Sequence, residues 1–371
     1  MPAATELPAR SDVVVIGAGI TGLSAALHLA RAGREVVVLD RGDVWGEASG
    51  ANAGTLSLQV KHPHVMELME MSLDLWQQEA AFSDWEVTQT GGLRVALSSR
   101  EVDMLRTSVA LQRSRGFDVE FLEGRALADH APWLGGEVLA ASACPRDAHS
   151  TPLSVGPRLM TSATDAGARL VGHAGVRAID SGDGCRLATP AGTIRCDILV
   201  IAAGAWSGQV AAMLGVRLPL MVDVNMLTIT EPAPPVLDRV VTHIGGVLTL
   251  KQYSNGTCMI GGGWQGRGSL ESGEKDIDHV RLLHNLTFAS RVVPALRSLG
   301  IQRCWSGFES VAPDALPVLG RLPGHRHVLI ATGARGGYSL GPALGRAVAE
   351  LVTTGTASVP AESFDPARLL S

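Results

Sequence analysis

The chain has 371 residues, of which 46% are hydrophobic and 18% are charged, a composition typical of a globular protein large enough for two domains. Its formal net charge of −5 excludes a general electrostatic attraction to nucleic acid or to anionic lipid. The sequence has no apolar run of about 18 residues that could span a bilayer. The N-terminal stretch lacks the apolar core of a signal peptide, so we expect a cytoplasmic protein without a transmembrane segment.

Cysteine and glycine usage narrows the class of protein further. The five cysteines are scattered, with no pair at metal-ligand spacing, so we expect no metal site. Their odd number also argues against a disulfide framework. The 43 glycines are too many for a helical bundle and favour an α/β protein with tight turns around a ligand.

Residues 12–40 form the first recognisable unit, in which a strand, a glycine-rich turn, a helix and a second strand follow one another. Residues 13–16 are a continuous apolar run of the kind found in strands buried on both faces. Three glycines follow at the spacing that allows a tight turn, the approach of a pyrophosphate and close packing of the helix on the strand: Gly17, Gly19 and Gly22. The N-terminus of the helix then offers unpaired N–H groups to phosphate.

The second half of this unit supports the same interpretation. Apolar residues recur at helical spacing as far as Gly33, and residues 36–39 form the next buried strand. Asp40 ends that strand at the distance expected for a carboxylate that binds a ribose 2′-OH. Strand, glycines, helix, strand and terminal acid in this order predict a dinucleotide site.

Helices and short strands alternate between this unit and the middle of the chain. Residues 46–54 are small and polar enough to lie close to a large planar ligand. Thr151 and Pro152 indicate the start of a helix, with Thr151 as its N-cap. We expect helices at residues 63–82, 101–115 and from 151 towards 167, and strands within 90–97, 117–143, 169–171, 175–180, 185–188 and 192–196.

Residues 197–206 form a second buried strand that ends in small residues. This pattern again indicates a strand end close to the phosphates of the ligand, far in sequence from the first such strand. Further along, Asn255 and Gly256 predict a hairpin turn between alternating segments typical of antiparallel strands. We expect strands at 218–230, 247–252, 258–262 and 327–331, and helices at 276–291 and 343–353.

Signals of a nucleotide domain therefore lie at both ends and in the middle of the chain, with sheet-like material between them. We expect an α/β fold in which a Rossmann-like domain is interwoven with a smaller α+β substrate domain built on an antiparallel sheet. The expected nucleotide domain comprises residues 1–82, 149–216 and 306–371, and the expected substrate domain comprises residues 83–148 and 217–305.

These segments together resemble the D-amino-acid oxidase superfamily of FAD enzymes, nearly from end to end. Within it the chain is most similar to flavin subunits of proline, hydroxyproline and opine dehydrogenases, and to glycine and sarcosine oxidases. The resemblance rests on residues 17–22, 49–54, 197–206, 305–320 and 333–342. It implies FAD as the cofactor and oxidation of an amino-acid-like C–N bond, with a hydride passing to flavin N5 and an imine that hydrolyses.

The FAD contacts that the glycine unit and the resemblance imply fall in six segments. The adenosine is expected at residues 17–40, and the isoalloxazine near residues 49–54 and 333–338. The glycine turn at 333–337 and the helix after it are expected to point N–H groups at the N1–C2=O edge of the flavin. The expected contacts are Gly17, Ala18, Gly19, Ile20, Thr21, Gly22, Asp40, Arg41, Ser49, Gly50, Ala51, Asn52, Ala53, Gly54, Val176, Ala203, Gly204, Trp206, Gly333, Arg335, Gly336, Gly337 and Tyr338.

The chain departs from its relatives where they bind substrate. Relatives often carry histidines in the terminal glycine loop, which here reads Gly-Ala-Arg-Gly from Gly333. Many also place a carboxylate-binding arginine where this chain has Glu309. A larger or cationic substrate, such as an opine, is therefore more credible than simple glycine or sarcosine.

Four residues are candidates for contact with the substrate, and each has a structural alternative. Arg335 could hold a carboxylate in a bidentate manner or lie solvated at the loop edge. Lys251 and Tyr253 end a strand that faces the substrate in relatives, but they could also be a surface lysine and a half-buried tyrosine. Glu309 could pair with a cationic amine or with a neighbouring arginine.

Three classes of function remain open. The chain could be an FAD enzyme that oxidises a secondary amine or amino acid, a flavin subunit active only in a hetero-oligomeric dehydrogenase, or a non-catalytic FAD-binding subunit. Sarcosine oxidases place a lysine at the position aligned with Met259, and a fixed positive charge stabilises the superoxide that forms during reaction with O₂. We therefore expect a dehydrogenase rather than an oxidase.

Overall fold

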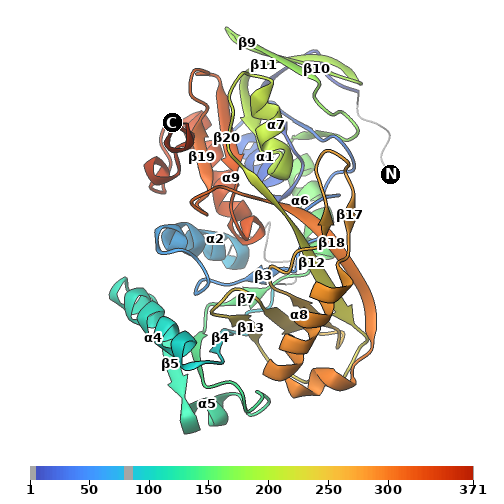
Figure 1. Cartoon of the computed structure of the whole chain (residues 1–371). Coiled ribbons are helices and arrows are strands. Elements are labelled where there is room, and N and C mark those ends of the chain that lie inside the picture. Colours follow the sequence, from blue (N-terminus) through green and yellow to red (C-terminus); the bar gives the residue numbers. More distant parts are fainter. Residues whose placement is uncertain (1–5, 79–86, 371) are drawn as a thin grey trace.

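The structure, a computed structural model, describes residues 6–78 and 87–370, which form two large sheets with helices around them (Figure 1). The first sheet and its helices occupy the upper half of Figure 1, and the second sheet occupies the lower half. The long strands β12 and β18 extend between the two halves. No helix among the described residues is both long and apolar enough to cross a membrane.

The first sheet is the Rossmann-like part of the molecule, with the strand order β19-β20-β11-β1-β2-β8. β1 lies at its centre and pairs in parallel with β2 and β11, while the hairpin of β9 and β10 continues antiparallel from the first half of β11. Its strands are β1 (Arg10–Ile16), β2 (Val36–Leu39), β8 (Arg169–Val171), β9 (Ala178–Gly182), β10 (Gly184–Thr189), β11 (Gly192–Ile201), β19 (Val318–Arg321) and β20 (Val328–Thr332).

Two helices pack closely beside this sheet because glycines of one face the other. A Cβ on Gly341 of α9 would lie 2.5 Å from the side chain of Ile20, and one on Gly345 would lie 2.5 Å from the backbone of Ala25. The backbones of α1 and α9 can therefore approach further than larger side chains would allow. The helices of this half are α1 (Ile20–Arg31), α2 (Met66–Gln78), α6 (Pro152–Asp165), α7 (Ser207–Ala212) and α9 (Gly337–Thr353), with short 3₁₀ turns η1 (Pro63–Val65), η2 (Gly204–Trp206), η4 (Ala361–Phe364) and η5 (Pro366–Leu369).

The second sheet has the order β18-β12-β15-β14-β13-β4-β6-β5 and is antiparallel except for the parallel pair of β13 and β4. Its strands are β4 (Gly92–Ala96), β5 (Glu120–Glu123), β6 (Ala140–Cys144), β12 (Met221–Thr230), β13 (Val240–His243), β14 (Thr249–Gln252), β15 (Cys258–Gly261) and β18 (Ile301–Val311). Two-stranded pieces are formed by β3 (Thr55–Leu56) with β7 (Ala148–His149) and by β16 (Arg267–Gly268) with β17 (Lys275–Asp276).

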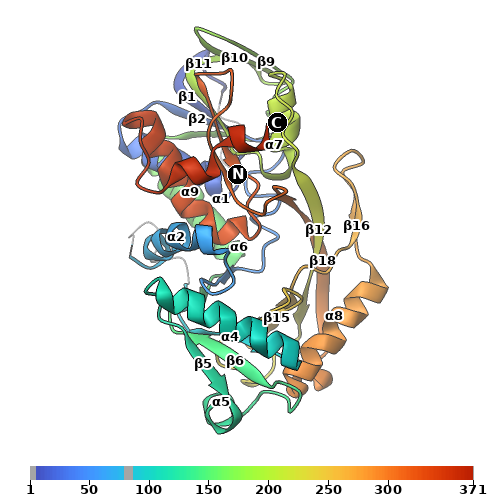
Figure 2. The same ribbon diagram turned by 60° about the vertical axis from the view of Figure 1, so that its left-hand side comes forward.

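The helices of the second half lie at different places on this sheet. Figure 2 shows α4 beside β5 and β6, whereas α8 lies beside β15 nearer the other end of the sheet. α4 starts with a capping box, because Ser98 and Glu101 each bind the backbone N–H of the other. The elements are α4 (Ser99–Ser114), α5 (Gly124–His130), α8 (His279–Val292) and the 3₁₀ turn η3 (Pro294–Ser298).

Several expected elements need correction. The strands expected at 192–196 and 197–206 are a single strand, β11, and the strand expected at 175–180 begins only at Ala178. α9 begins at Gly337, six residues before the expected start, so Pro342 lies inside the helix rather than before it. Thr151 is the N-cap residue of α6, but its side chain makes no capping hydrogen bond.

The expected α/β class is confirmed, while the division into domains stays a prediction. The boundary expected between residues 305 and 306 falls inside β18, which pairs with β12 along nearly its whole length. The last residues of the helix expected at 63–82, and the boundary after residue 82, lie outside the described residues.

Candidate active site

A cavity of about 1250 Å³ is lined by residues from both halves of the molecule. One part of its wall comes from the turn between β1 and α1 and from the end of β2. Another part comes from β13, β14, β18 and the loop before α9. Because single-ligand pockets are usually between about 300 and 1,000 Å³, this cavity has room for a dinucleotide together with a small substrate.

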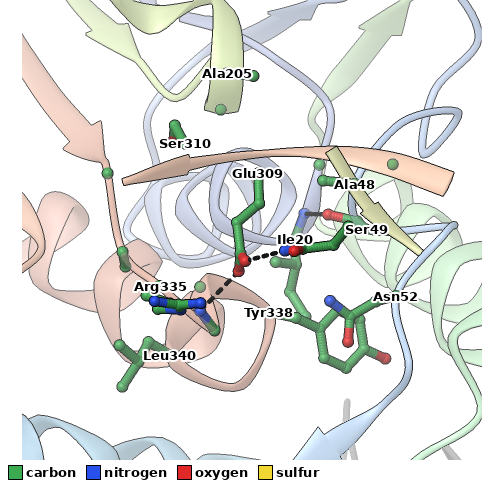
Figure 3. A pocket seen from close by; sticks show the side chains of 18 of the residues that line it. Ile20, Ala48, Ser49, Asn52, Ala205, Glu309, Ser310, Arg335, Tyr338 and Leu340 are labelled. Carbon is green, nitrogen blue, oxygen red and sulfur yellow. Dashed lines mark hydrogen bonds between the residues drawn. The ribbon is translucent and has the colours of Figure 1, made fainter. Parts of the chain in front are cut away.

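The turn between β1 and α1 depends on glycine for steric reasons. Gly17 has a φ of +106°, and a Cβ at this position would lie 2.3 Å from the carbonyl oxygen of Ala202. A Cβ on Gly22 would lie 1.9 Å from the carbonyl oxygen of Gly17. The N–H of Ile20 donates to Ser49 Oγ at 2.9 Å, which ties the segment containing Ser49 to the helix start (Figure 3).

Asp40 braces this turn from the end of β2. Its Oδ2 accepts the N–H of Ala18 at 2.8 Å, and its Oδ1 accepts the N–H of Gly42 at 2.9 Å. Burial raises the pKa of the carboxyl, and these two N–H donors oppose that rise. Beside it, the guanidinium of Arg41 lies over the ring of Trp206 at 4.0 Å.

These features fit FAD. The glycines leave the backbone of the turn open at the N-terminus of α1, where N–H groups favour a pyrophosphate. Asp40 lines the cavity at the end of β2, as a ribose-binding carboxylate must.

Most of the expected FAD contacts line the cavity, and four do not. Those that line it are Gly17, Gly19, Ile20, Thr21, Asp40, Arg41, Ser49, Ala51, Asn52, Ala53, Val176, Ala203, Gly204, Trp206, Gly333, Arg335, Gly336, Gly337 and Tyr338. Ala18, Gly22, Gly50 and Gly54 lie behind the wall instead. Gly50 and Gly54 back onto the carbonyl oxygens of Trp45 and Ser150, where a Cβ would be 2.3 and 2.0 Å away, so they allow close packing of the wall.

Glu309 on β18 reaches the loop before α9 (Figure 3). Its Oε1 accepts the N–H of Gly336 at 2.7 Å, and its Oε2 accepts a hydrogen bond from Asn225 Nδ2 at 2.6 Å. Burial raises the pKa of Glu309, and the Gly336 N–H, Arg335 and Lys61 oppose that rise. Within the glycine turn that is expected to point N–H groups at the flavin, the N–H of Gly336 is bound to Glu309 instead.

Two cations lie near this carboxylate. Lys61 Nζ donates to the carbonyl oxygen of Gly336 at 3.1 Å, and burial lowers its pKa to about 8, while Glu309 and the buried Asp147 act in the opposite direction. Arg335 is exposed, lines the cavity and approaches Gly263, where its Nη2 would lie 3.1 Å from an added Cβ. The three groups give this part of the wall charges of both signs.

Lys251 and Tyr253 do not line the cavity. Lys251 is fully buried, and its Nζ donates at 2.5 Å to the hydroxyl of Thr55, which does line it. The alternative of a surface lysine is therefore wrong. Burial without a carboxylate partner lowers the pKa of Lys251 to about 7. The hydroxyl of Tyr253 donates to the carbonyl oxygen of Ala53 at 3.0 Å, and burial raises its pKa.

Three residues that sequence reasoning did not single out belong to this wall: Lys61, Arg94 and Asn225. Lys61 stands just before the expected helix start at Pro63, and Arg94 lies within an expected strand. Neither position carries a motif. The alternation of β4 could have shown only that the side chain of Arg94 faces away from those of its neighbours Leu93 and Val95.

The sequence of the chain matches one known protein family over most of its length. A family model described as DAO, FAD dependent oxidoreductase, matches residues 12–351, which is most of the chain. The chain belongs to this family. It is therefore an FAD-dependent oxidoreductase, as the resemblance implied.

Individual relatives are similar to the chain over most of its length. It is 28% identical to a glycine oxidase of Geobacillus kaustophilus (strain HTA426), covering 92% of this chain and 93% of that protein. It is also 28% identical to an opine oxidase subunit of Rhizobium meliloti, covering 83% and 84%. The crystal structure of L-proline dehydrogenase from P. horikoshii superimposes with a TM-score of 0.90 at 27% identity, covering 98% of each chain.

Proposed function

We propose that this chain oxidises the C–N bond of a carboxylated secondary amine or amino acid to an imine, which then hydrolyses. The observation that carries the proposal is that one cavity joins the glycine turn after β1 to a wall that holds Lys61, Glu309 and Arg335. An amino acid has the complementary charges, a carboxylate and an amine. FAD supplies the hydride acceptor for such an oxidation.

In this proposal the cations hold the carboxylate and Glu309 faces the amine. Arg335 can bind a carboxylate in a bidentate manner, and Lys61 adds a second charge. Asn225 and the N–H of Gly336 fix the orientation of the Glu309 carboxylate. The relatives, which include a glycine oxidase, a subunit of an opine oxidase and an L-proline dehydrogenase, support a substrate of this class.

Glu309 is also our candidate for proton transfer. A protonated amine has no lone pair with which to form an imine, so its proton has to leave before the adjacent C–H bond breaks. Burial raises the pKa of Glu309, which makes its carboxylate a better proton acceptor than an exposed one. Lys61, held on the same glycine, can stabilise the carboxylate form before the proton arrives.

We further propose that the enzyme passes its electrons to an acceptor other than O₂. Met259, which stands where sarcosine oxidases have a lysine, is buried and uncharged. Lys251 lies directly opposite it on β14, but Thr55 separates it from the cavity. The test is to reduce the flavin with substrate and mix it with aerated buffer in a stopped-flow instrument. Slow reoxidation with fast turnover on a dye acceptor is expected, and rapid reoxidation with stoichiometric H₂O₂ would show an oxidase.

The second candidate is a flavin subunit that acts only in a complex. Two relatives from Rhizobium meliloti support it, because one is named as a subunit of an opine oxidase and the other as a subunit of a sarcosine oxidase. A screen for anaerobic bleaching of the flavin with D- and L-imino acids, N-methyl amino acids and opines separates the alternatives. Bleaching of the isolated chain supports the first candidate, and bleaching that requires a second subunit supports the complex. A yellow protein that no amine bleaches in either state would be a non-catalytic subunit.

A further inference from the structure

Arg94 is a cation in the cavity wall that the proposed function does not use. It lies on β4, and its Nη1 and Nη2 donate to the carbonyl oxygens of Gln59 at 2.9 Å and Ile244 at 3.3 Å. A longer bond of 3.4 Å joins Nη1 to the hydroxyl of Ser108. All three acceptors are neutral, and the Nε donor has no partner among the described residues.

The nearest negative group does not neutralise this charge by contact. Asp147 is fully buried, and its carboxylate already accepts hydrogen bonds from Ser57 Oγ at 2.6 Å, the N–H of Leu58 at 2.8 Å and Gln59 Nε2 at 2.9 Å. A guanidinium has five N–H donors, so Arg94 keeps donors for a ligand. Burial lowers the pKa of Arg94 to about 10, which still leaves it charged at neutral pH.

Neutral groups surround Arg94 in the wall. We call this part of the cavity the Arg94 arm, formed by Val60, Arg94, Met104, Ser108, Thr242 and Ile244. Next to it, burial lowers the pKa of His243, which binds Glu101 at 3.2 Å and is not a second permanent cation. An anion that enters the Arg94 arm therefore meets one permanent positive charge and the hydroxyls of Ser108 and Thr242.

A short turn connects the Arg94 arm with Arg335. Arg94 binds the carbonyl oxygen of Ile244. Two atoms lie near the position that a Cβ on Gly263 would take: the carbonyl oxygen of Gly246 at 3.4 Å and Arg335 Nη2 at 3.1 Å. Ile244 and Gly246 are two residues apart, so their Cα atoms are separated by at most about 7.6 Å. The two guanidinium groups thus lie at the two ends of one small turn in the same cavity.

We propose that the Arg94 arm binds a second carboxylate of the substrate, so that the preferred substrate is a secondary amine with a carboxylate on each of its two substituents. This inference rests on the proposed function. The carboxylate next to the oxidised carbon is bound by Arg335 and Lys61, and the carboxylate on the other arm of the amine is bound by Arg94. The charges agree, because three cations outnumber the two nearby carboxyl groups, Glu309 and the buried Asp147, and an excess of positive charge suits a dicarboxylate better than a zwitterion with no net charge.

The test compares amines that differ only in the second carboxylate. The holoenzyme is assayed with N-(carboxymethyl)glycine against N-methylglycine, and with N-(2-carboxyethyl)glycine against N-ethylglycine. We expect kcat/KM to favour at least one dicarboxylate by more than about tenfold, the factor that one charged hydrogen bond gives. Arg94→Gln should remove most of this preference, which is measured as the ratio of kcat/KM within each pair.

Two further variants separate recognition from structural damage. Arg94→Lys keeps the charge and should keep part of the preference. Arg113→Gln removes another arginine that binds a backbone carbonyl, that of Val119, but that does not line the cavity, and it should leave the preference unchanged. Loss of activity on both members of each pair in Arg94→Gln, with the preference intact, would overturn the inference.

A binding assay gives a readout that does not depend on turnover. Oxydiacetate and methoxyacetate have an ether oxygen in place of the amine and cannot be oxidised to an imine, and their affinities can be measured from the change in flavin absorbance. We expect oxydiacetate to bind at least about tenfold more tightly, and Arg94→Gln to abolish the difference. If the enzyme turns over monocarboxylates but shows no preference for dicarboxylates that depends on Arg94, this inference is overturned and the proposed function stands. If no amine reduces the flavin, the proposed function fails, while an ether preference that depends on Arg94 still supports the second carboxylate site.

Discussion

Around the turn after β1 the cavity wall is backbone, whereas around Glu309 it consists of long side chains from separate segments. In the first region a Cβ on Gly17 or Gly22 would overlap a carbonyl oxygen, so the shape of the wall depends on the absence of side chains at these two positions. In the second region Lys61, Arg94 and Arg335 come from three segments far apart in sequence. The difference suggests that substitutions in the first region affect whether the cofactor binds, and substitutions in the second affect which substrate is accepted.

The largest effect is expected from Gly19→Trp in the backbone region. The added indole would fill the space at the N-terminus of α1 that a pyrophosphate needs, and a Cβ alone would already lie 3.0 Å from Ser49 Oγ. We expect FAD binding to weaken by roughly a hundredfold or more, about 2.7 kcal/mol, so that the protein purifies colourless. The ratio of flavin to protein absorbance measures the loss.

Gly42→Ala is the matched control for this variant. A Cβ on Gly42 would have nothing within 4 Å, so this glycine of the same region can be replaced without a clash. The control should purify yellow. A Gly19→Trp protein with full flavin content would disprove the role of the turn.

Arg335→Ala tests the charged region and should affect substrate without affecting cofactor. A charged hydrogen bond to a carboxylate contributes roughly 1.5 to 3 kcal/mol, so half-saturation by substrate should require ten- to a hundredfold more of it. Because Arg335 is exposed, the fold and the flavin content should be unchanged. Steady-state kinetics at full flavin occupancy gives the answer, and unchanged kinetics would remove Arg335 from the site.

Lys61→Met should have a smaller effect that depends on pH. The pKa of Lys61 is lowered to about 8, so the side chain is charged below this pH and neutral above it. In the wild type, binding of the carboxylate analogue methoxyacetate should therefore weaken as the pH rises through about 8, and this change should be absent in Lys61→Met. Lys61→Arg stays charged throughout and should bind equally well on both sides. If the affinity of the wild type for methoxyacetate does not change as the pH rises through about 8, Lys61 does not bind the carboxylate as proposed.

Lys251→Met is expected to have the smallest effect and concerns stability. The pKa of Lys251 is about 7 in the folded chain and 10.5 when unperturbed, so the unfolded chain binds this proton more readily between these values. The wild type therefore loses stability as the pH falls through this window, and the loss is complete below about pH 7. Lys251→Met should raise the melting temperature by a few degrees at about pH 6 and by less at about pH 9.

The remaining lysine provides the control for this prediction. Lys275 forms an ion pair with Glu47 at 2.5 Å and is part-buried rather than fully buried. Lys275→Met should not stabilise the protein at low pH, because it removes a compensated charge. Equal melting temperatures of wild type and Lys251→Met at both pH values would show that burial does not penalise this lysine.

Much of the first region follows from local sequence, and little of the second does. Residues 13–40 encode strand, turn, helix and acid within one continuous stretch, and β1, α1 and β2 form there as expected. Glu309 and Arg335 were recognised as candidates only through the resemblance, and the structure brings both to the cavity. Lys251 was expected to lie at the surface or to face the substrate, and the structure shows it fully buried and outside the cavity lining.

The sequence by itself determined the dinucleotide unit, because a turn of glycines between two buried strands needs only neighbours within about thirty residues. Only the tertiary structure decided that Lys61 and Glu309 bind the same glycine, and that Arg94 and Arg335 lie near one turn. These contacts join segments that are far apart in the chain or meet through a loop of the second sheet. Charge and burial at such positions depend on chain crossings between two sheets, for which no local pattern exists.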